Sequence, residues 1–470
     1  MANGLSLADL PAEILQEVFF WCLPTPSNAN QHAVFMRREI LTSPRHAPLL
    51  LCHVCRHWRD VALSSPNLWT TLSVIVRLGV AVPAPDLVSL WLSRSGALPL
   101  EISLHQQNES SVNCVAAGRV LDIFEEHISR WGKVRLELYG PRSTRLGIGG
   151  EKVGPLLKEF RLHISDDFSW QAEEDLFGVF NHAPQLQSLH VSRIPRLDLS
   201  AHSSIQVPWG QLAHLSLDYV PAIGTALRIL DMTPNLESCS MKIDTTRGSL
   251  MYNPPQLPKL HTLSINLGFE SLAGFLDHLI VPKLAHLAVS VRGTLEQYRW
   301  AHEQFDAFLT RSGCRIRRLE IHDTGMTSSE FASCIQHPGL QALTELVVDD
   351  TKGWTLNPFV TEAALDLLTV PSFNLPNSSC ARDRKILHSD SPRIACLLPS
   401  LKRLTIRGNC FLSPDGTIAK MVESRWRNHS KEIVRLELMD VELPTNHMED
   451  LRRLKEFQGE GLEVVFSQQY

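Results

Sequence analysis

The 470-residue sequence has no uninterrupted apolar run of about 18 residues, the length that a membrane-spanning helix requires. We also expect the absence of an apolar leader, because Asp9, Glu13 and Glu17 lie where a secretory signal would be apolar. These two absences predict a chain that neither spans a membrane nor is secreted. We expect it in the cytoplasm, the nucleus or both.

A disulfide framework is also missing. The ten cysteines are scattered along the chain, which fits a reducing compartment. Charge of one sign is not in excess either, since the formal net charge is -5 and basic clusters such as Arg315, Arg317 and Arg318 are short. We therefore expect no nucleic-acid or membrane partner.

No catalytic motif is present. The 20 histidines are spread along the chain without an HExxH or GxSxG arrangement, and the glycine-rich run at 147–154 lacks the Gly-Lys-Ser/Thr ending of a phosphate loop. Cys52 and Cys55 would share a helix face, but no second ligand pair follows them at zinc spacing. Asp349 and Asp350 are adjacent in a predicted strand and should face opposite sides. We therefore expect no enzyme, no metal and no cofactor.

Two apolar helical patterns are present near the amino terminus, at residues 9–19 and 49–62. Pro11 suits the first helical position. The apolar residues Leu10, Ile14 and Val18 recur at four-residue steps. The second pattern ends at Pro66, with Leu68 and Trp69 beyond it as a further apolar anchor. A unit of about 60 residues buries its own apolar surface poorly, so part of this surface should be left for a partner.

The blocks Leu-Pro-x-Glu-Ile-Leu, Val-Cys-x-x-Trp-Arg and Pro-x-Leu-Trp follow one another in these patterns, and their order resembles the F-box family. This resemblance implies docking on a Skp-type adaptor and, through it, on a cullin-RING ubiquitin ligase. A loop insertion at 24–48, with a short helix at 34–41, departs from the family pattern. The residues that would face the adaptor by this resemblance are Leu10, Pro11, Ile14, Leu15, Val18, Val54, Cys55, Trp58, Leu68 and Trp69. The alternative that they form only the core of a small helical domain stays open.

From about residue 70 onward, a fragment of the form Pro-x-Leu-x-x-Leu-x-apolar returns, together with variants that lack the proline. The first strand residues of these fragments are Phe160, Leu189, Leu215, Cys239, Leu263, Leu287, Leu319, Leu346, Leu404 and Leu436. Most of the steps between them are 24 to 32 residues long, and one is 58. Such a period is typical of leucine-rich repeats, in which each unit is one strand plus a returning helix.

The predicted fold class is therefore α/β, with a small helical F-box-like module at 5–70 and an irregular leucine-rich-repeat-like solenoid with a curved parallel sheet at 71–470. An insertion at 351–398 contains a helix at 362–370. One further predicted helix begins at a capping Asp86 and ends at Gly96. Another occupies residues 115–132 and ends at Gly132. Predicted strands are 100–104, 134–138 and 462–466, and only Asn409 offers the buried ladder residue usual for such repeats.

The middle position of each strand should face away from the helices. The candidates for target binding at these positions are Arg161, His190, Ser216, Ser240, Ser264, Glu320, Thr405 and Glu437. Their mixed chemistry favours a protein partner over a single charged ligand, although each could be a simple solvated strand residue. The leading hypothesis is a substrate-recognition subunit of a Skp-cullin-F-box ubiquitin ligase. The alternatives are an adaptor-binding scaffold without a ubiquitylation role and a ligand-binding protein or enzyme built on the repeats.

Overall fold

The computed structural model describes residues 10–23, 44–139, 154–164, 179–180, 183–192, 207–245, 255–268, 271–292, 300–350, 358–370, 397–408, 411–427, 433–439 and 447–467. These residues form an α/β fold with a 15-stranded, mostly parallel sheet and 11 α-helices, which confirms the predicted class. The chain divides into two compact units, residues 1–219 and 220–470. No helix in the described ranges combines the length and the apolar character needed to cross a bilayer.

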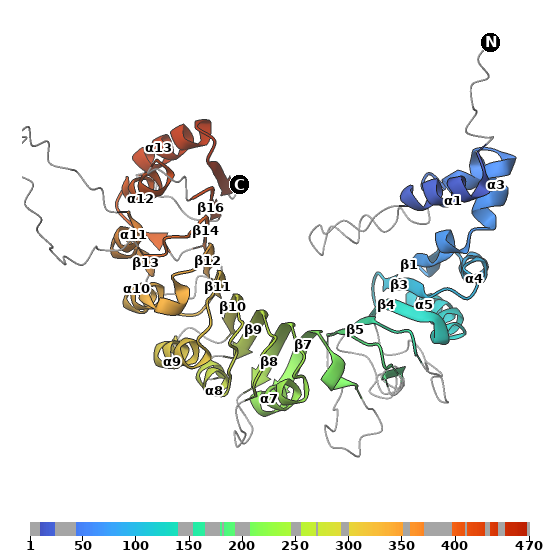
Figure 1. Ribbon diagram of the computed structural model, residues 1–470, viewed down its shortest axis with the longest axis horizontal. Coiled ribbons are helices and arrows are strands. Elements are labelled where there is room, and N and C mark those ends of the chain that lie inside the picture. The colour runs from blue at the N-terminus through green and yellow to red at the C-terminus, as the bar shows by residue number, and fades with distance from the viewer. Residues whose placement is uncertain are drawn as a thin grey trace, which may run out of the picture. The chain divides into compact units, whose positions relative to one another are not determined.

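Unit 1 begins with helices and continues with strands that alternate with helices (Figure 1). Its helices are α1 (Ala12–Trp21), α3 (Arg56–Leu63), α4 (Pro85–Arg94) and α5 (Ser111–Glu125), with 3₁₀ turns η2 (Leu50–His53), η3 (Pro66–Trp69), η4 (Ile128–Arg130) and η6 (Trp209–Gln211). Its strands are β1 (Thr71–Arg77), β2 (Val80–Val82), β3 (Leu100–Gln106), β4 (Trp131–Leu138), β5 (Glu159–Ile164), β6 (Ser188–Val191) and β7 (His214–Ala222).

Strand side chains of unit 1 alternate between two faces. Leu100, Ile102 and Leu104 of β3 are buried on the face covered by α4 and α5, as expected for period-two strands. β1 and β3 to β7 pair in parallel, and one residue from the opposite face of each strand stands in register with its neighbours. This row is Ser73, Ser103, Arg135, Arg161, His190 and Ser216. We call the face that carries it the open face of unit 1.

The edge of this sheet is closed by β2, which pairs antiparallel with β1. The two strands are joined by Leu78 and Gly79, both with positive φ (51° and 77°), as a two-residue hairpin turn requires. The backbone N–H of Gly79 donates to Oδ1 of the buried Asn113, at 2.6 Å. Pro83 follows β2 and ends the strand after three residues, which leaves little backbone for edge-to-edge association.

Unit 2 repeats the same strand and helix order. Its helices are α7 (Ile223–Met232), α8 (Ser271–Asp277), α9 (His302–Ser312), α10 (Ser328–Gln336), α11 (Glu362–Leu368), α12 (Thr417–Trp426) and α13 (Met448–Gly459), with the 3₁₀ turn η7 (Pro338–Leu340). Its main strands are β8 (Ser238–Thr245), β9 (Thr262–Gly268), β10 (His286–Arg292), β11 (Arg318–His322), β12 (Glu345–Asp350), β14 (Arg403–Gly408), β16 (Arg435–Met439) and β17 (Glu463–Ser467). Two short strands, β13 (Val360–Thr361) and β15 (Phe411–Leu412), pair separately.

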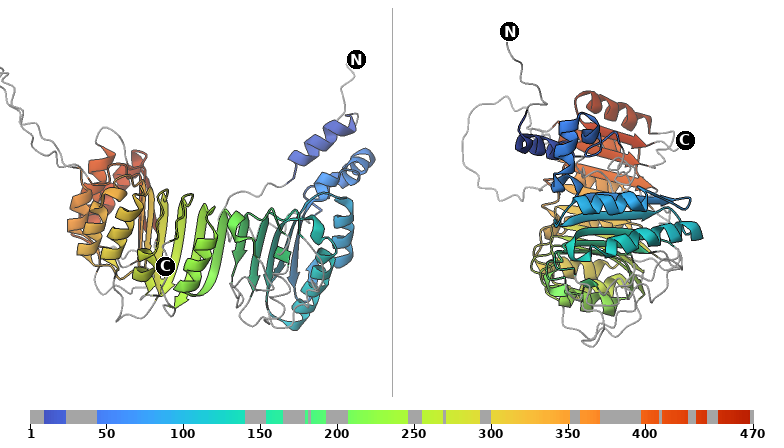
Figure 2. Two further views of the ribbon diagram at one scale, coloured as in Figure 1. Left: turned by 60° about the horizontal axis from the view of Figure 1, so that its bottom comes forward. Right: turned by 90° about the vertical axis from the view of Figure 1, so that its right-hand side faces the viewer.

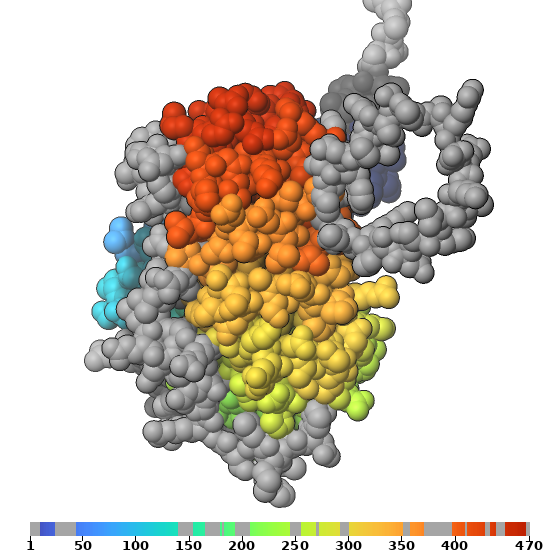
Figure 3. All heavy atoms as spheres, turned by 90° about the vertical axis from the view of Figure 1, so that its left-hand side faces the viewer, coloured from blue at the N-terminus to red at the C-terminus, as the bar shows by residue number. Residues whose placement is uncertain are grey.

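All main strands of unit 2 are parallel and in register, and Figure 2 shows them side by side in chain order. One buried row lies across the core face, where the helices pack. It consists of Cys239, Leu263, Leu287, Leu319, Leu346, Leu404, Leu436 and Val464. Figure 3 shows unit 2 from the left-hand side of Figure 1, where α9 to α11 lie. On this face the surface colours change in chain order, from green and yellow to red. The leucine fragments therefore predicted these strands and their inward positions correctly.

The boundaries of two predicted helices are wrong. Pro85 is the first residue of α4, so Asp86 lies in the first turn and makes no cap. The next helix is capped by Ser110, whose side chain accepts from Asn113 N–H, and it ends at Glu125. Gly132 lies in β4 instead of ending that helix. The predicted strands 100–104, 134–138 and 462–466 correspond to β3, β4 and β17, and the predicted helix 362–370 to α11. The predicted helix 34–41 and Asn409 lie outside the described residues.

Candidate interaction surfaces

Helix α1 is held against α3 by its inner side. Leu15 and Phe19 are fully buried, and the Phe19 and Trp58 rings lie 4.9 Å apart at an angle of 58°. His57 of α3 reaches the start of α1, with Nε2 3.4 Å from the Leu10 carbonyl oxygen. Pro11, predicted to be the first helical residue, is instead the N-cap, and α1 begins one residue later at Ala12. These contacts fix which side of α1 faces outward.

The outward side of α1 is apolar. Ile14 is 51% exposed, Val18 43% and Trp21 76%. They follow the exposed Pro11 at steps of three and four residues, so the four side chains share one face of the helix. We call Pro11, Ile14, Val18 and Trp21 the α1 stripe. Single exposed apolar residues are common on proteins, but a row of four on one helix is typical of a surface that binds a partner.

The second predicted helix, 49–62, is broken. Residues 50–53 form a 3₁₀ turn, and α3 starts only at Arg56. Cys55 is extended (φ -156°) and caps α3, with its sulfur accepting the Trp58 N–H at 3.4 Å. Cys52 and Cys55 therefore do not share a helix face, and the prediction that they would is wrong.

Leu68 and Trp69 belong to the core of unit 1. Both are at most 2% exposed. The Trp69 indole N–H donates to the Ala62 carbonyl at 2.9 Å, and the ring packs edge-on against Trp91 at 4.8 Å. These two residues hold η3 between α3 and α4, so no partner can contact them directly.

The ten residues expected at the adaptor therefore divide by exposure. Four are exposed: Pro11, Ile14, Val18 and Val54. Three are half-buried: Leu10, Cys55 and Trp58. Three are buried, namely Leu15, Leu68 and Trp69. Sequence reasoning missed the exposed Phe20, Trp21 and Leu50. Trp21 could have been found, because it continues the α1 spacing three residues after Val18.

The residues expected to bind a target stand in one row in each unit. Arg161, His190 and Ser216 are in register on the open face of unit 1. In unit 2 the row runs through Ser240, Ser264, Ala288, Glu320, Val347, Thr405 and Glu437. All the predicted residues are half-buried except Thr405, which is 7% exposed and lies 3.3 Å from Glu437 Oε2. We call this second face the open face of unit 2.

Glu320 is the centre of an ionic network on the open face of unit 2. Its carboxylate lies 2.9 Å from His286 Nε2, 3.2 Å from His322 Nε2 and 2.7 Å from Arg318 Nε. Hydrogen bonds with the two histidines and with Arg318 hold the pKa of Glu320 well below its usual value. Burial opposes charge on His322, but its hydrogen bonds to Asp349 and Glu320 outweigh burial and raise its pKa to about 9.

Further ion pairs follow along the sheet toward β17. Glu345 lies between Arg318 (2.7 Å) and Arg403 (3.1 Å). Arg435 lies between Glu437 and Glu463, at 2.5 Å from each. Each of these pairs joins neighbouring strands or residues two apart on one strand. The open face of unit 2 is thus a charged surface whose opposite charges largely compensate one another.

Charge on the open face of unit 1 is paired in a similar way. Glu159 lies 3.1 Å from Arg135 and 2.8 Å from Arg161. Burial raises the pKa of Glu159, but the two guanidinium groups outweigh it and leave the pKa below its usual value. The next strands carry His190, whose Nε2 is 3.6 Å from Asp218 Oδ2.

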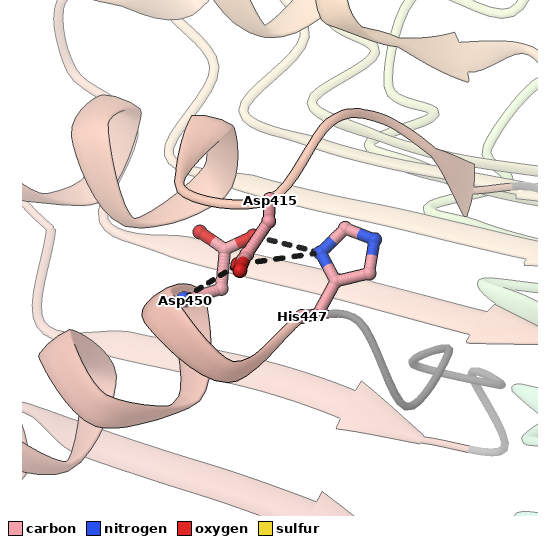
Figure 4. Close-up of side chains that lie close together, drawn as sticks. All are labelled: Asp415, His447 and Asp450. Atoms are coloured by element: carbon pink, nitrogen blue, oxygen red, sulfur yellow. Dashed lines mark hydrogen bonds and ion pairs between the residues drawn. The ribbon is translucent and has the colours of Figure 1, made fainter.

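Asp415, His447 and Asp450 are the one group in the described ranges whose ligand atoms are close enough for a metal ion (Figure 4). Hydrogen bonds already account for their positions. Asp415 accepts from the backbone N–H of Glu449 (3.0 Å) and Asp450 (2.9 Å) at the start of α13. Asp450 accepts from the Ala419 N–H in α12 at 2.8 Å and contacts His447 Nδ1 at 2.9 Å. The two carboxylates therefore cap each other's helices, and the residues do not require a cation.

The remaining sequence candidates do not form a site. Asp349 lies on the open face beside His322, whereas Asp350 is fully buried, as the strand alternation predicts. Most of the glycine-rich run at 147–154 lies outside the described residues. Neither a protein-family model nor a curated protein matches this chain.

Proposed function

We propose that this chain is the substrate-recognition subunit of a Skp-cullin-F-box type ubiquitin ligase. In this proposal residues 5–70 are an F-box-like module that docks on a Skp-type adaptor, and residues 71–470 are a leucine-rich-repeat-like solenoid that holds a target protein. The chain forms no bond itself. It contributes proximity between the target and the ligase subunits.

The observation that carries the proposal is the α1 stripe. The resemblance to the F-box family points to this helix, and Ile14, Val18 and Trp21 keep about half or more of their side-chain surface exposed. Burying three such side chains against a partner helix would contribute roughly 1 to 2 kcal/mol each, before the cost of association. An amphipathic helix that presents residues three and four apart is a common docking element.

The repeat assignment is supported by the register of unit 2. Its leucine positions align strand by strand although the intervening segments differ in length. Parallel strands joined by helices on one face are the arrangement that such repeats produce. The opposite face is then available for a protein target.

The test is copurification of the full chain with a Skp-type adaptor. Ile14→Lys combined with Val18→Lys places two charges in the α1 stripe without touching the core, and we expect binding to fall at least 100-fold. The matched control is Gln16→Lys, an exposed position on another side of α1, which should bind as wild type. Absence of binding by the wild type, or equal binding by the double variant with an unchanged melting temperature, would contradict the proposal.

A reconstituted ligase assay distinguishes a substrate receptor from a scaffold. If proteins that bind the open faces copurify with the adaptor complex but are never ubiquitylated, the chain is a scaffold. Ubiquitylation that depends on the α1 stripe supports the receptor role.

A further inference from the structure

Among the described residues, the open face of unit 1 carries four imidazoles. They are His105 on β3, His163 on β5, His190 on β6 and His214 on β7. All four lie at positions that alternate with buried strand residues, so they share the face opposite α4 and α5. Histidine is the side chain whose charge changes nearest to neutral pH.

Without the imidazoles, this face is electrically balanced. Among the described residues it carries four cations and four carboxylates. The cations are Arg77, Lys133, Arg135 and Arg161, and the carboxylates are Glu101, Glu137, Glu159 and Asp218. The protonation of the histidines therefore determines whether the face is neutral or positive.

His190 lies in the middle of this arrangement. Arg161 and His163 face it from β5, Asp218 faces it from β7, and Glu137 contributes from β4. Its side chain is 30% exposed, so solvent and a partner can reach it. Burial, together with Arg161 and His163, outweighs the two carboxylates and lowers the pKa of His190 below its usual value. The ring is thus mainly neutral at neutral pH.

His105 and His163 stand on either side of Glu137 in the strand register. His105 Nδ1 lies 2.5 Å from the Glu137 carboxylate, and the His163 ring lies 5.7 Å from the Tyr139 ring. Glu137 is thus the carboxylate next to two imidazoles. Because Glu137 is already part of the charge balance of this face, each imidazole that takes up a proton adds one positive charge for a partner to compensate.

We propose that the open face of unit 1 binds a carboxylate-rich segment of a target protein and takes up protons when it does so. This inference rests on the proposed function, because it specifies the class of target and adds regulation by pH. Carboxylates of the target add negative charge to a face that is otherwise balanced, and they stabilise the charged form of His163 and His190. Since protonation and binding favour each other, the affinity rises as the pH falls below neutral.

The test uses the full chain without adaptor and a 12-residue peptide of alternating glutamate and serine as the probe. The peptide remains ionised at pH 5.5, so a change in affinity reports on the protein. We expect binding about tenfold tighter at pH 5.5 than at pH 7.5. Calorimetry in two buffers with different ionisation enthalpies should show net proton uptake by the wild type, a readout that needs no variant.

The variant His163→Gln with His190→Gln should lose most of this pH dependence, with a change below about threefold. The control His53→Gln with His127→Gln removes two imidazoles of unit 1 that lie outside the sheet face, and it should behave as wild type. Three results would overturn the inference: no binding at pH 5.5, binding without proton uptake, or equal competition by a 12-nucleotide oligothymidine, which would indicate a general polyanion surface. None of these results depends on adaptor binding.

Discussion

Arg425 is the largest charged side chain that the described residues bury completely. From α12, its guanidinium donates to the carbonyl oxygens of Leu368 (2.7 Å), Leu397 (2.6 Å) and Leu398 (2.9 Å). It thus joins the end of α11 to the backbone at residues 397–398. Partial negative charge at helix ends favours such a cation.

We expect Arg425→Met to lower the free energy of unfolding of unit 2 by about 3 kcal/mol, because three carbonyls lose a charged donor in a buried site. The melting temperature measured by differential scanning calorimetry should fall by at least about 5 °C. Lys420→Met, on the exposed side of the same helix, is the control and should change little. Equal melting temperatures for wild type and Arg425→Met would show that the contacts are not needed.

We expect exposed cysteines to react much faster than buried ones. Burial raises the pKa of the Cys239 and Cys334 thiols to about 12 and that of Cys314 to about 11, whereas Cys22 is exposed. Since the thiolate is the reacting form, iodoacetamide at pH 8 should modify Cys22 at least 100-fold faster than the three buried thiols. Peptide mass spectrometry of the native protein measures these rates. Similar rates at Cys22 and Cys239 would mean that the core of unit 2 opens readily.

Pairs of elements are joined by side chains that the sequence order does not reveal. Asp450 at the start of α13 caps α12, and Asp415 before α12 caps α13. We expect Asp450→Ala to destabilise unit 2 by about 1 to 3 kcal/mol, because Ala419 N–H loses its acceptor in a buried site. Zinc or EDTA should leave the wild-type melting temperature unchanged. A zinc-dependent increase that Asp450→Ala abolishes would instead identify a metal site.

Strands β11 and β12 are joined by His322, which lies 3.4 Å from Asp349. Its pKa is raised to about 9, so the folded state favours the charged ring. The resulting contribution to stability is fully present below the unfolded value of about 6.5 and is lost as the pH rises through about 9. The melting-temperature difference between wild type and His322→Gln should therefore be larger at pH 6 than at pH 10. His278→Gln, on the segment after α8, is the control, and an equal difference at both pH values would contradict the assignment.

The strands could be predicted from the sequence because a two-residue period places leucines inward regardless of how long the connecting segments are. The helical region was harder. A 3₁₀ turn and an α-helix have similar periods, so the apolar pattern did not reveal the break before Cys55. Leu15 and Ile14 are neighbours in α1, and which of them is buried depends on the side from which α3 and η3 pack against the helix. Ion pairs such as His286 with Glu320, 34 residues apart, depend on the strand register.

At the scale of the whole molecule, the proposed functions use surfaces without shared residues. Adaptor docking uses the α1 stripe, whereas acidic-target binding uses strand residues of the open face of unit 1. Substitutions at sites with no common contacts usually have additive effects. The two activities should therefore be lost one at a time, by changes confined to one surface.

This separation predicts four outcomes from two variants. Ile14→Lys with Val18→Lys should lose adaptor binding but keep the pH-dependent affinity for the acidic peptide within about twofold. His163→Gln with His190→Gln should show the reverse, with adaptor binding unchanged at pH 7.5. Binding of adaptor and of peptide is measured separately by calorimetry on each full-length variant, after melting curves establish that it is folded. Exposed side chains on separate elements offer no direct route by which a change at one surface could affect the other. Loss of both activities in either folded variant would therefore contradict the prediction and mean that the two surfaces are coupled.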